Sequence, residues 1–240
     1  MKESTVTGND SVQSEGHESP FTWLVPVVYD LGAPALFSPL GGWDTLREQA
    51  LDTFEVRAGE HVLELGCGTG GITEKLIKRG ACVTAIDRSE PMLKRARRRA
   101  PSATIIRADI RSLQCERRFD RVLLAFVLHH LDAETRMHAL RFARRVLAPE
   151  GTIGIVDWVK PTGDIRRRCL QIYLTLLEPP CAKDWTDEGF ESHLRRAELT
   201  ILKDRSFARG FVRLVVAGRD TVRADSAERT PGAASHLLAS

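Results

Sequence analysis

The segment His61-Val-Leu-Glu-Leu-Gly-Cys-Gly-Thr-Gly-Gly71 joins a short apolar run to a glycine-rich turn. Residues 61–65 have the composition of a buried strand, and residues 72–78 carry apolar side chains at helical spacing. Glycines at such a strand-to-helix turn let the backbone approach a ligand closely, while N–H groups at the helix start face it. The segment therefore predicts a strand–turn–helix unit with a nucleotide-like ligand at its turn.

Short apolar strands and longer helical segments alternate on either side of this turn. We expect strands over residues 61–65, 81–86, 103–107, 119–126 and 151–158, and helices over residues 46–54, 72–78, 89–100 and 133–147. This alternation predicts an α/β fold in which helices cover both faces of a parallel sheet. Helices over 165–177 and 188–197 then precede strands over 199–203 and 211–216, which we expect to pair antiparallel at the sheet edge.

The composition indicates one folded domain with polar ends. The 240 residues are 42% hydrophobic and 28% charged, which is typical of a globular chain. We expect a domain over 20–218 that includes a helical insertion over 159–197, a disordered leader over 1–19 and a flexible tail over 219–240. The net charge of +3 is too small to indicate a nucleic-acid partner.

The expected location is the cytoplasm. No apolar run approaches the ~20 residues that a membrane-spanning helix needs, so no integral membrane segment is expected. The five cysteines are widely spaced and form no C-x-x-C pair, which fits a reducing compartment and provides no metal-ligand set.

Three carboxylates near the strand ends narrow the choice of ligand. Asp87 follows Gly66 by 21 residues, where a carboxylate accepts ribose hydroxyls in NAD enzymes and in other nucleoside-binding proteins. Glu64 lies in an otherwise apolar strand, where a buried charge needs a partner. Asp109 and Ile110 follow the third strand and could contact an adenine ring. Because Gly66, Gly68 and Gly71 also satisfy the dinucleotide pattern G-x-G-x-x-G, the turn alone leaves NAD open.

Six short motifs in one order give the chain a family resemblance. They are Val-Leu-Glu-Leu-Gly-Cys-Gly-Thr-Gly (62–70), Ala-Ile-Asp-Arg-Ser-Glu-Pro-Met-Leu (85–93), Ala-Asp-Ile (108–110), Phe-Asp-Arg-Val (119–122), Leu-His-His-Leu (128–131) and Leu-Ala-Pro-Glu-Gly-Thr (147–152). Over residues 43–158 the chain resembles the class I S-adenosylmethionine-dependent methyltransferases, and most closely the ubiquinone/menaquinone-biosynthesis type within the methyltransferase type 11 group. The resemblance implies S-adenosylmethionine as the methyl donor and S-adenosylhomocysteine as the product.

The resemblance also implies a fold and a set of cofactor-binding residues. The fold is a Rossmann-like three-layer sandwich around a mostly parallel seven-stranded sheet of order 3-2-1-4-5-7-6, with strand 7 antiparallel and a helical insertion between strands 5 and 6. The residues expected at the cofactor are Tyr29 and Glu64, then Gly66, Cys67, Gly68 and Gly70 at its amino-acid part, Asp87 at the ribose, Arg88, Met92, Asp109 and Ile110 at the adenine, and Ala125, Phe126 and Val127 at the methionine side.

The chemistry of methyl transfer predicts a second group of residues. The reaction is an in-line displacement, and a hydroxyl or protonated amine acceptor also needs a base. His129 and His130 follow the fourth strand, where open α/β sheets bind ligands, so they are the candidate bases. In an extended segment they would point in opposite directions, so at most one would face the acceptor. Trp158, Tyr173 and Trp185 are the expected acceptor contacts.

The acceptor class stays open on the sequence alone. The favoured interpretation is a natural product or other small metabolite, and the alternatives are a quinone or a phospholipid. An NAD-dependent oxidoreductase shares the glycine turn and Asp87, but the chain has no Tyr-x-x-x-Lys pair of the short-chain dehydrogenase type. A cofactor-binding partner protein without activity is the non-enzymatic alternative. The acceptor atom and the choice between monomer and homodimer are also open.

Overall fold

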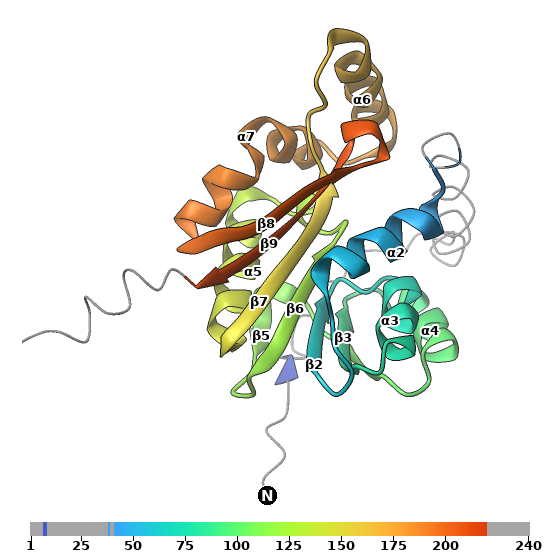
Figure 1. Ribbon diagram of the computed structural model, residues 1–240, viewed down its shortest axis with the longest axis vertical. Helices are drawn as coiled ribbons and strands as arrows, with labels where there is room; N and C mark the ends of the chain where they lie inside the picture. The colour runs from blue at the N-terminus through green and yellow to red at the C-terminus, as the bar shows by residue number, and fades with distance from the viewer. Residues whose placement is uncertain (1–6, 9–37, 39–40, 220–240) are drawn as a thin grey trace, which may run out of the picture.

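The protein is built around one twisted seven-stranded sheet (Figure 1). The computed structural model describes residues 7–8, 38 and 41–219. The strands are β2 (His61–Leu65), β3 (Cys82–Asp87), β4 (Thr104–Arg107), β6 (Phe119–Ala125), β7 (Leu147–Trp158), β8 (Leu199–Phe207) and β9 (Val212–Arg219). A separate two-stranded sheet pairs β1 (Thr7–Gly8) with β5 (Leu113–Gln114).

The sheet has the predicted order. It runs β4-β3-β2-β6-β7-β9-β8, which is 3-2-1-4-5-7-6 when its seven strands are numbered along the chain. The first five pair in parallel, and β9 is antiparallel to both β7 and β8. The carboxyl ends of five strands therefore meet at one edge, where an open α/β sheet binds its ligands.

Helices cover both faces of the sheet. They are α2 (Trp43–Phe54), α3 (Gly71–Lys78), α4 (Glu90–Arg99), α5 (Ala133–Val146), α6 (Asp164–Leu177) and α7 (Cys181–Arg196), with short 3-10 turns η2 (Ile110–Ser112), η3 (Leu128–His130) and η4 (Ala208–Gly210). Side chains of α2, α3, α4 and α6 pack on one face, and those of α5 and α7 pack on the other. The predicted three-layer sandwich is confirmed.

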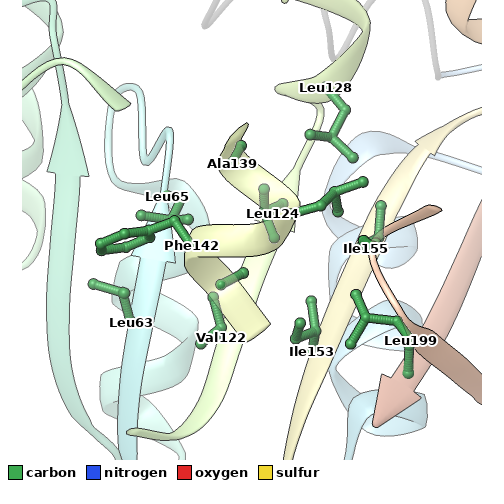
Figure 2. Close-up of a cluster of buried hydrophobic side chains, with 14 of the residues drawn as sticks. Leu63, Leu65, Val122, Leu124, Leu128, Ala139, Phe142, Ile153, Ile155 and Leu199 are labelled. Carbon is green, nitrogen blue, oxygen red and sulfur yellow. The ribbon is translucent and has the colours of Figure 1, made fainter. Parts of the chain in front are cut away.

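Alternating burial along the central strands builds both layers. Leu63 and Leu65 of β2 pack against Val122 and Leu124 of β6 on the face under α5, where Phe142 covers them (Figure 2). Val62 and Leu123 of the same strands belong to the opposite core cluster. Because both faces are buried, these strands read as continuous apolar runs rather than as alternating ones.

Several boundaries differ from those expected. The helix predicted from residue 188 begins at Cys181, directly after Pro180, and Gly189 interrupts it with φ 75°. Because glycine usually ends a helix, the sequence pattern did not indicate that helical residues continue on both sides of Gly189. The last two strands along the chain are also longer than predicted, since β8 extends to Phe207 and β9 to Arg219.

Other expectations concern segments that the structure describes only in part. Residues 1–6, 9–37, 39–40 and 220–240 lie outside the described residues, so the leader, the tail and the domain limits stay predictions. The expected insertion over 159–197 corresponds to α6 and α7, which lie between β7 and β8. Within the described ranges, no helix has the length and apolar character needed to cross a bilayer.

Candidate cofactor and acceptor site

The glycine turn requires glycine for two reasons, the φ angles of its backbone and the small space around it. Gly66, Gly68 and Gly70 have φ values of 77°, 54° and 78°, in the left-handed region that favours glycine. A Cβ atom on Gly66 would lie 2.6 Å from Cγ2 of Val127, and one on Gly70 would lie 2.8 Å from Cα of Ala96. The turn therefore packs directly against the end of β6 and against α4, with no room for larger residues at these two positions.

Asp87 ties the second strand to this turn. Its Oδ2 atom accepts a hydrogen bond from the backbone N–H of Gly68 at 2.9 Å, and its Oδ1 atom accepts one from Ser89 at 2.9 Å. Each carboxylate oxygen has a further lone pair, so both can still accept a ligand hydroxyl. The side chain is thus fixed in place beside the glycine turn.

Glu64 is buried next to the same turn. Thr73 donates its hydroxyl to Oε2 of Glu64 at 2.6 Å. Burial raises the pKa of Glu64 to about 7, although the Thr73 hydrogen bond and the positive charge of Arg47 act in the opposite direction. The sequence-based expectation that this carboxylate needs a partner is met by Thr73.

Arg47 of α2 is a candidate that the sequence analysis missed. The residue is buried, and its guanidinium lies so close to Gly71 that a Cβ there would be 2.6 Å from Nη1. Its Nε atom is buried and has no hydrogen-bond partner among the described residues. The available signal was a lone arginine on the apolar face that Leu46, Ala50 and Leu51 define. A buried cation at the glycine turn suits an anionic ligand group.

The expected adenine contacts gather at the ends of β3 and β4. The backbone N–H of Ala108 donates to the carbonyl of Asp87 at 3.1 Å, which holds the two strand ends together. Asp109 caps η2 and accepts hydrogen bonds from the backbone N–H and Nε of Arg111, which lower its pKa. Of the remaining residues, Met92 and Ile110 are half-buried and Arg88 is exposed.

A row of aromatic rings continues from the glycine turn along the strand ends. Ring centroids are 4.8 Å apart for Trp43 and Phe126, 5.9 Å for Phe126 and Trp158, and 5.0 Å for Trp158 and Tyr173. Phe126 has φ 55°, which is rare for an aromatic residue, and its N–H donates to the carbonyl of Val156 at 2.8 Å. The backbone is strained where the row passes the end of β6.

The two histidines lie beyond this row, in a different geometry from the one expected. They belong to the 3-10 turn η3 rather than to an extended segment, and their ring centroids are only 4.0 Å apart. The prediction that they point in opposite directions is wrong, because the chain turns directly after β6. His129 is 2% exposed at its side chain and His130 is 48% exposed.

The two histidines belong to a polar cluster, the histidine cluster, which also contains Asp157, Tyr173 and Glu178. The Nδ1 atom of His129 lies 2.6 Å from Oδ1 of Asp157. Oε2 of Glu178 lies 3.6 Å from Nε2 of His129 and 3.7 Å from Nδ1 of His130. Tyr173 donates its hydroxyl to Oε1 of Glu178 at 2.6 Å. Glu178 was not singled out in the sequence, since it follows α6 in a Glu-Pro-Pro step typical of a helix end.

The histidine cluster raises the pKa of His129 and lowers that of His130. Burial favours neutral His129, but the charges of Asp157 and Glu178 outweigh it and raise the pKa to about 9. Burial and the positive charge of His129 lower the pKa of His130 to about 4. At pH 7 the buried ring is therefore charged and the more exposed ring is neutral. Such a division is characteristic of acid–base sites.

The same atoms also satisfy the spacing of a cation site. His129, His130 and Glu178 each place one ligand atom within 4.8 Å of the others. The arrangement is explained equally well without a cation, by protons on the imidazoles. The hydrogen bonds made by Asp157 and Tyr173 already hold the side chains of the cluster in place. Chelation distinguishes the two cases, as discussed below.

One of the expected acceptor contacts, Trp185, lies in the core. Trp185 is 1% exposed, its Nε1 donates to the carbonyl of Trp158 at 3.0 Å, and its ring packs on Phe190 and His193. It is a core residue with no side-chain surface free for an acceptor, because α7 turns it inward. Tyr29 lies outside the described residues. Burial raises the pKa of Cys67 and keeps its thiol protonated.

The sheet order, the glycine turn and the carboxylates at the strand ends together define the class I S-adenosylmethionine-dependent methyltransferase fold. Residues 62–151 match a family described as a methyltransferase domain. The protein is an S-adenosylmethionine-dependent methyltransferase. Its own residues fit the cofactor, since Arg47 has an orphaned Nε and the turn would be filled by any Cβ at Gly66 or Gly70.

Several known proteins are similar to this chain. An uncharacterized methyltransferase of Synechocystis is 27% identical over 198 residues, which covers 82% of this chain and 93% of the relative. An uncharacterized methyltransferase of Mycobacterium tuberculosis is 35% identical over 115 residues, which covers 47% of this chain and 57% of the relative.

Solved structures of methyltransferases share the fold. Mitomycin 7-O-methyltransferase superimposes with a TM-score of 0.65 at 20% identity, over 83% of this chain and 59% of that one. Magnesium protoporphyrin IX methyltransferase of Synechocystis, with S-adenosylhomocysteine bound, gives 0.57 at 17% identity, over 82% and 98%. At these identities the likeness concerns the fold alone.

Proposed function

We propose that the protein methylates a small-molecule acceptor, a natural product or other metabolite, by in-line displacement. The supporting observation is the continuous path from the glycine turn through Phe126, Trp158 and Tyr173 to the histidine cluster. Aromatic walls with a few polar groups at one end are typical of sites for small organic ligands. Two structural neighbours, a mitomycin methyltransferase and a magnesium protoporphyrin IX methyltransferase, are also named for small organic acceptors.

The cofactor lies, on this proposal, along the carboxyl ends of β2, β3, β4 and β6. When bound, S-adenosylmethionine supplies an electrophilic methyl group on a sulfonium sulfur. We assign Arg47 to its carboxylate and Asp87 to its ribose hydroxyls, because the first is a buried cation and the second a fixed acceptor. The remaining contacts are those the sequence predicts: Glu64, Gly66, Cys67, Gly68 and Gly70 at the turn, Arg88, Met92, Asp109 and Ile110 at the adenine, and Ala125, Phe126 and Val127 at the methionine side.

The histidine cluster would receive the acceptor proton. His130 is neutral at pH 7 and half-exposed, so a ring nitrogen can take the proton of a hydroxyl or ammonium group as the acceptor atom bonds to the methyl carbon. His129 stays charged between Asp157 and Glu178 and orients the neighbouring ring. Tyr173, which is half-buried, would position the acceptor against this base, and Trp158, which is 5% exposed, would support the Tyr173 ring from behind.

A coupled assay for S-adenosylhomocysteine tests this proposal across panels of phenols, alcohols, amines, quinones and phospholipid vesicles. We expect turnover with aromatic hydroxyl or amine compounds and binding of S-adenosylmethionine by calorimetry. Turnover with quinones or vesicles alone would show that the acceptor is a lipid and would contradict a small metabolite. Cofactor binding without turnover on any panel would indicate a partner protein instead of an enzyme.

We also propose a reducing, cytoplasmic location. The five cysteines all lie in described segments and all are free thiols, two of them exposed, which suits a compartment that keeps thiols reduced. Fractionation of cells that express a tagged chain checks this location, and recovery outside the cytoplasm would contradict it.

A further inference from the structure

A concave site lies at the opposite edge of the sheet from the residues assigned to the cofactor. It is an open pocket of about 500 Å³ at the end of α5, beside the end of α7, the start of β6 and the end of β9. Figure 1 shows α5 and the tip of β9 side by side at this end. Six arginines from four segments line it, namely Arg118, Arg141, Arg144, Arg145, Arg196 and Arg219.

Few carboxylates balance this charge. Glu198 is the one acidic residue in the lining, and its Oε2 lies 2.8 Å from Nη2 of Arg144. Arg196 lies 3.8 Å from Glu188, which is outside the pocket. The side chains of Arg118 and Arg141 make no hydrogen bond or ion pair with any residue that the structure describes. The pocket therefore carries uncompensated positive charge.

Part of the pocket is rigid. Nη2 of Arg219 donates to the carbonyl oxygens of Leu147 at 2.7 Å and of Arg144 at 3.3 Å. The Nε atoms of Arg144 and Arg219 are buried without a partner among the described residues. Burial lowers the pKa of Arg219, and the charges of Arg118 and Arg144 lower it further. Repulsion between these like charges costs free energy, and a bound anion would reduce that repulsion.

Helix electrostatics explain only some of these arginines. Arg144 and Arg145 lie in the last turn of α5, where cations favour the helix dipole, and Arg141 shares their face. Arg219 donates to the last carbonyls of α5 and so also benefits from that helix end, and Arg196 ends α7. Arg118 comes from a loop and has no such reason to lie here, and helix ends do not explain why six cations share one pocket.

We propose that this pocket binds a small anion with two or more phosphate groups. Guanidinium groups bind phosphate oxygens in pairs, so six of them exceed what a single phosphate can use. The volume lies within the usual range of small-molecule sites. The lining has no aromatic ring on which a base could stack, which favours a polyphosphate group over single-stranded nucleic acid.

Calorimetry with the full chain tests this site, using inorganic triphosphate as the probe. We expect saturable binding with one site per chain, and sulfate at equal ionic strength should not reproduce it. Inositol hexakisphosphate in a second arm distinguishes an inorganic from an organic source, and either ligand bound at one site supports the proposal. Absence of saturable heat with both, or a response to sulfate of equal size, would overturn it, as would binding of duplex DNA alone.

Charge-reversal variants locate the binding. Arg141→Glu should weaken triphosphate binding by about tenfold or more, because it removes a charged hydrogen-bond donor and adds a repulsive charge. Arg168→Glu on exposed α6 is the matched control and should bind as the unaltered chain does. Equal weakening in both variants would mean general attraction to a basic surface and would contradict the site. Arg145→Gln, a milder change, provides a second test if Arg141→Glu does not fold.

The site is independent of the methyl-transfer proposal. The lining of the pocket includes none of the residues assigned to the cofactor or acceptor, so Arg141→Glu should leave cofactor affinity unchanged. Loss of triphosphate binding with intact cofactor binding separates the two sites.

Discussion

The Nδ1 atom of His129 lies 2.6 Å from Oδ1 of Asp157, and the backbone N–H of His129 donates to Oδ2 of the same carboxylate at 3.2 Å. Both residues are almost completely buried. The turn that follows β6 is thereby fastened to the end of β7 at the rim where the acceptor would bind. A buried charge of this kind persists only when it is paired and hydrogen-bonded.

This pair predicts that stability depends on pH. The folded-state pKa of His129 is about 9, above its ordinary value of 6.5, so its contribution is complete below about pH 6.5 and is lost as the pH rises through about 9. The free energy of unfolding, measured by urea denaturation, should therefore fall across this interval. Asp157→Asn should remove most of that fall. Without the charge of Asp157, only Glu178 opposes the effect of burial, which lowers the pKa of His129. Asp187→Asn, on an exposed ion pair, should leave the fall intact, and equal behaviour of the two variants would contradict the assignment.

His130→Ala tests the proposed base. We expect kcat to fall by about 10²–10⁴-fold, the usual contribution of a positioned base, with cofactor affinity unchanged. Since the pKa of His130 is lowered to about 4, kcat/KM of the unaltered enzyme should decline only as the pH falls toward that value. His138→Ala on α5 is a control outside the cluster. A kcat that is equal in the two variants would remove His130 from the mechanism.

Asp87→Ala tests the ribose contact. Loss of a charged hydrogen-bond acceptor costs about 1.5–3 kcal/mol, so the Kd for S-adenosylmethionine should rise by roughly 10- to 150-fold. Circular dichroism should show an intact fold. Asp52→Ala, on the exposed side of α2, should leave the Kd unchanged. An unchanged Kd in Asp87→Ala would exclude this placement of the ribose.

Gly66→Ala tests the packing of the glycine turn. Its Cβ would meet Val127 at 2.6 Å, whereas a Cβ at Gly59, with a similar φ of 83°, meets nothing within 4 Å. Both substitutions incur the ~1–2 kcal/mol cost of a left-handed alanine, and only Gly66→Ala adds a steric conflict. Thermal unfolding and cofactor calorimetry should show the larger loss in Gly66→Ala. Similar losses would mean that the close approach to Val127 has no importance.

Chelation distinguishes proton transfer from metal chemistry at the histidine cluster. If His129, His130 and Glu178 handle protons, EDTA treatment should leave turnover unchanged, and metal analysis of the purified chain should give no stoichiometric cation. Loss of turnover on chelation, with recovery on adding a divalent cation, would show that the cluster is a metal centre whose three ligand atoms lie within 4.8 Å.

Much of the site followed from short-range patterns. Gly66, Asp87 and Asp109 each stand at or just beyond the carboxyl end of a strand, and the carboxyl ends of parallel strands meet at one edge, so their proximity could be predicted. Arg47 and Glu178 could not be found in this way. Each lies on a helix or at a helix end where an arginine or a glutamate is ordinary, and only packing against the sheet brings it to the rim.

The sequence by itself determined the order of strands and helices, because that order depends on periodicity. Its motifs, whose residues are near neighbours along the chain, resemble those of a methyltransferase family, and this resemblance implied the sheet topology and the class of cofactor. Tertiary structure alone decided that His129 and His130 lie side by side and that Trp185 is inside the core. It also decided that Asp157 and Glu178 raise the pKa of His129, while burial and the charge of His129 lower that of His130. The contacts between η3, β7 and the end of α6 join residues far apart in the chain. They exist only once the strand register and the packing of α6 and α7 are fixed, so no local pattern encodes them.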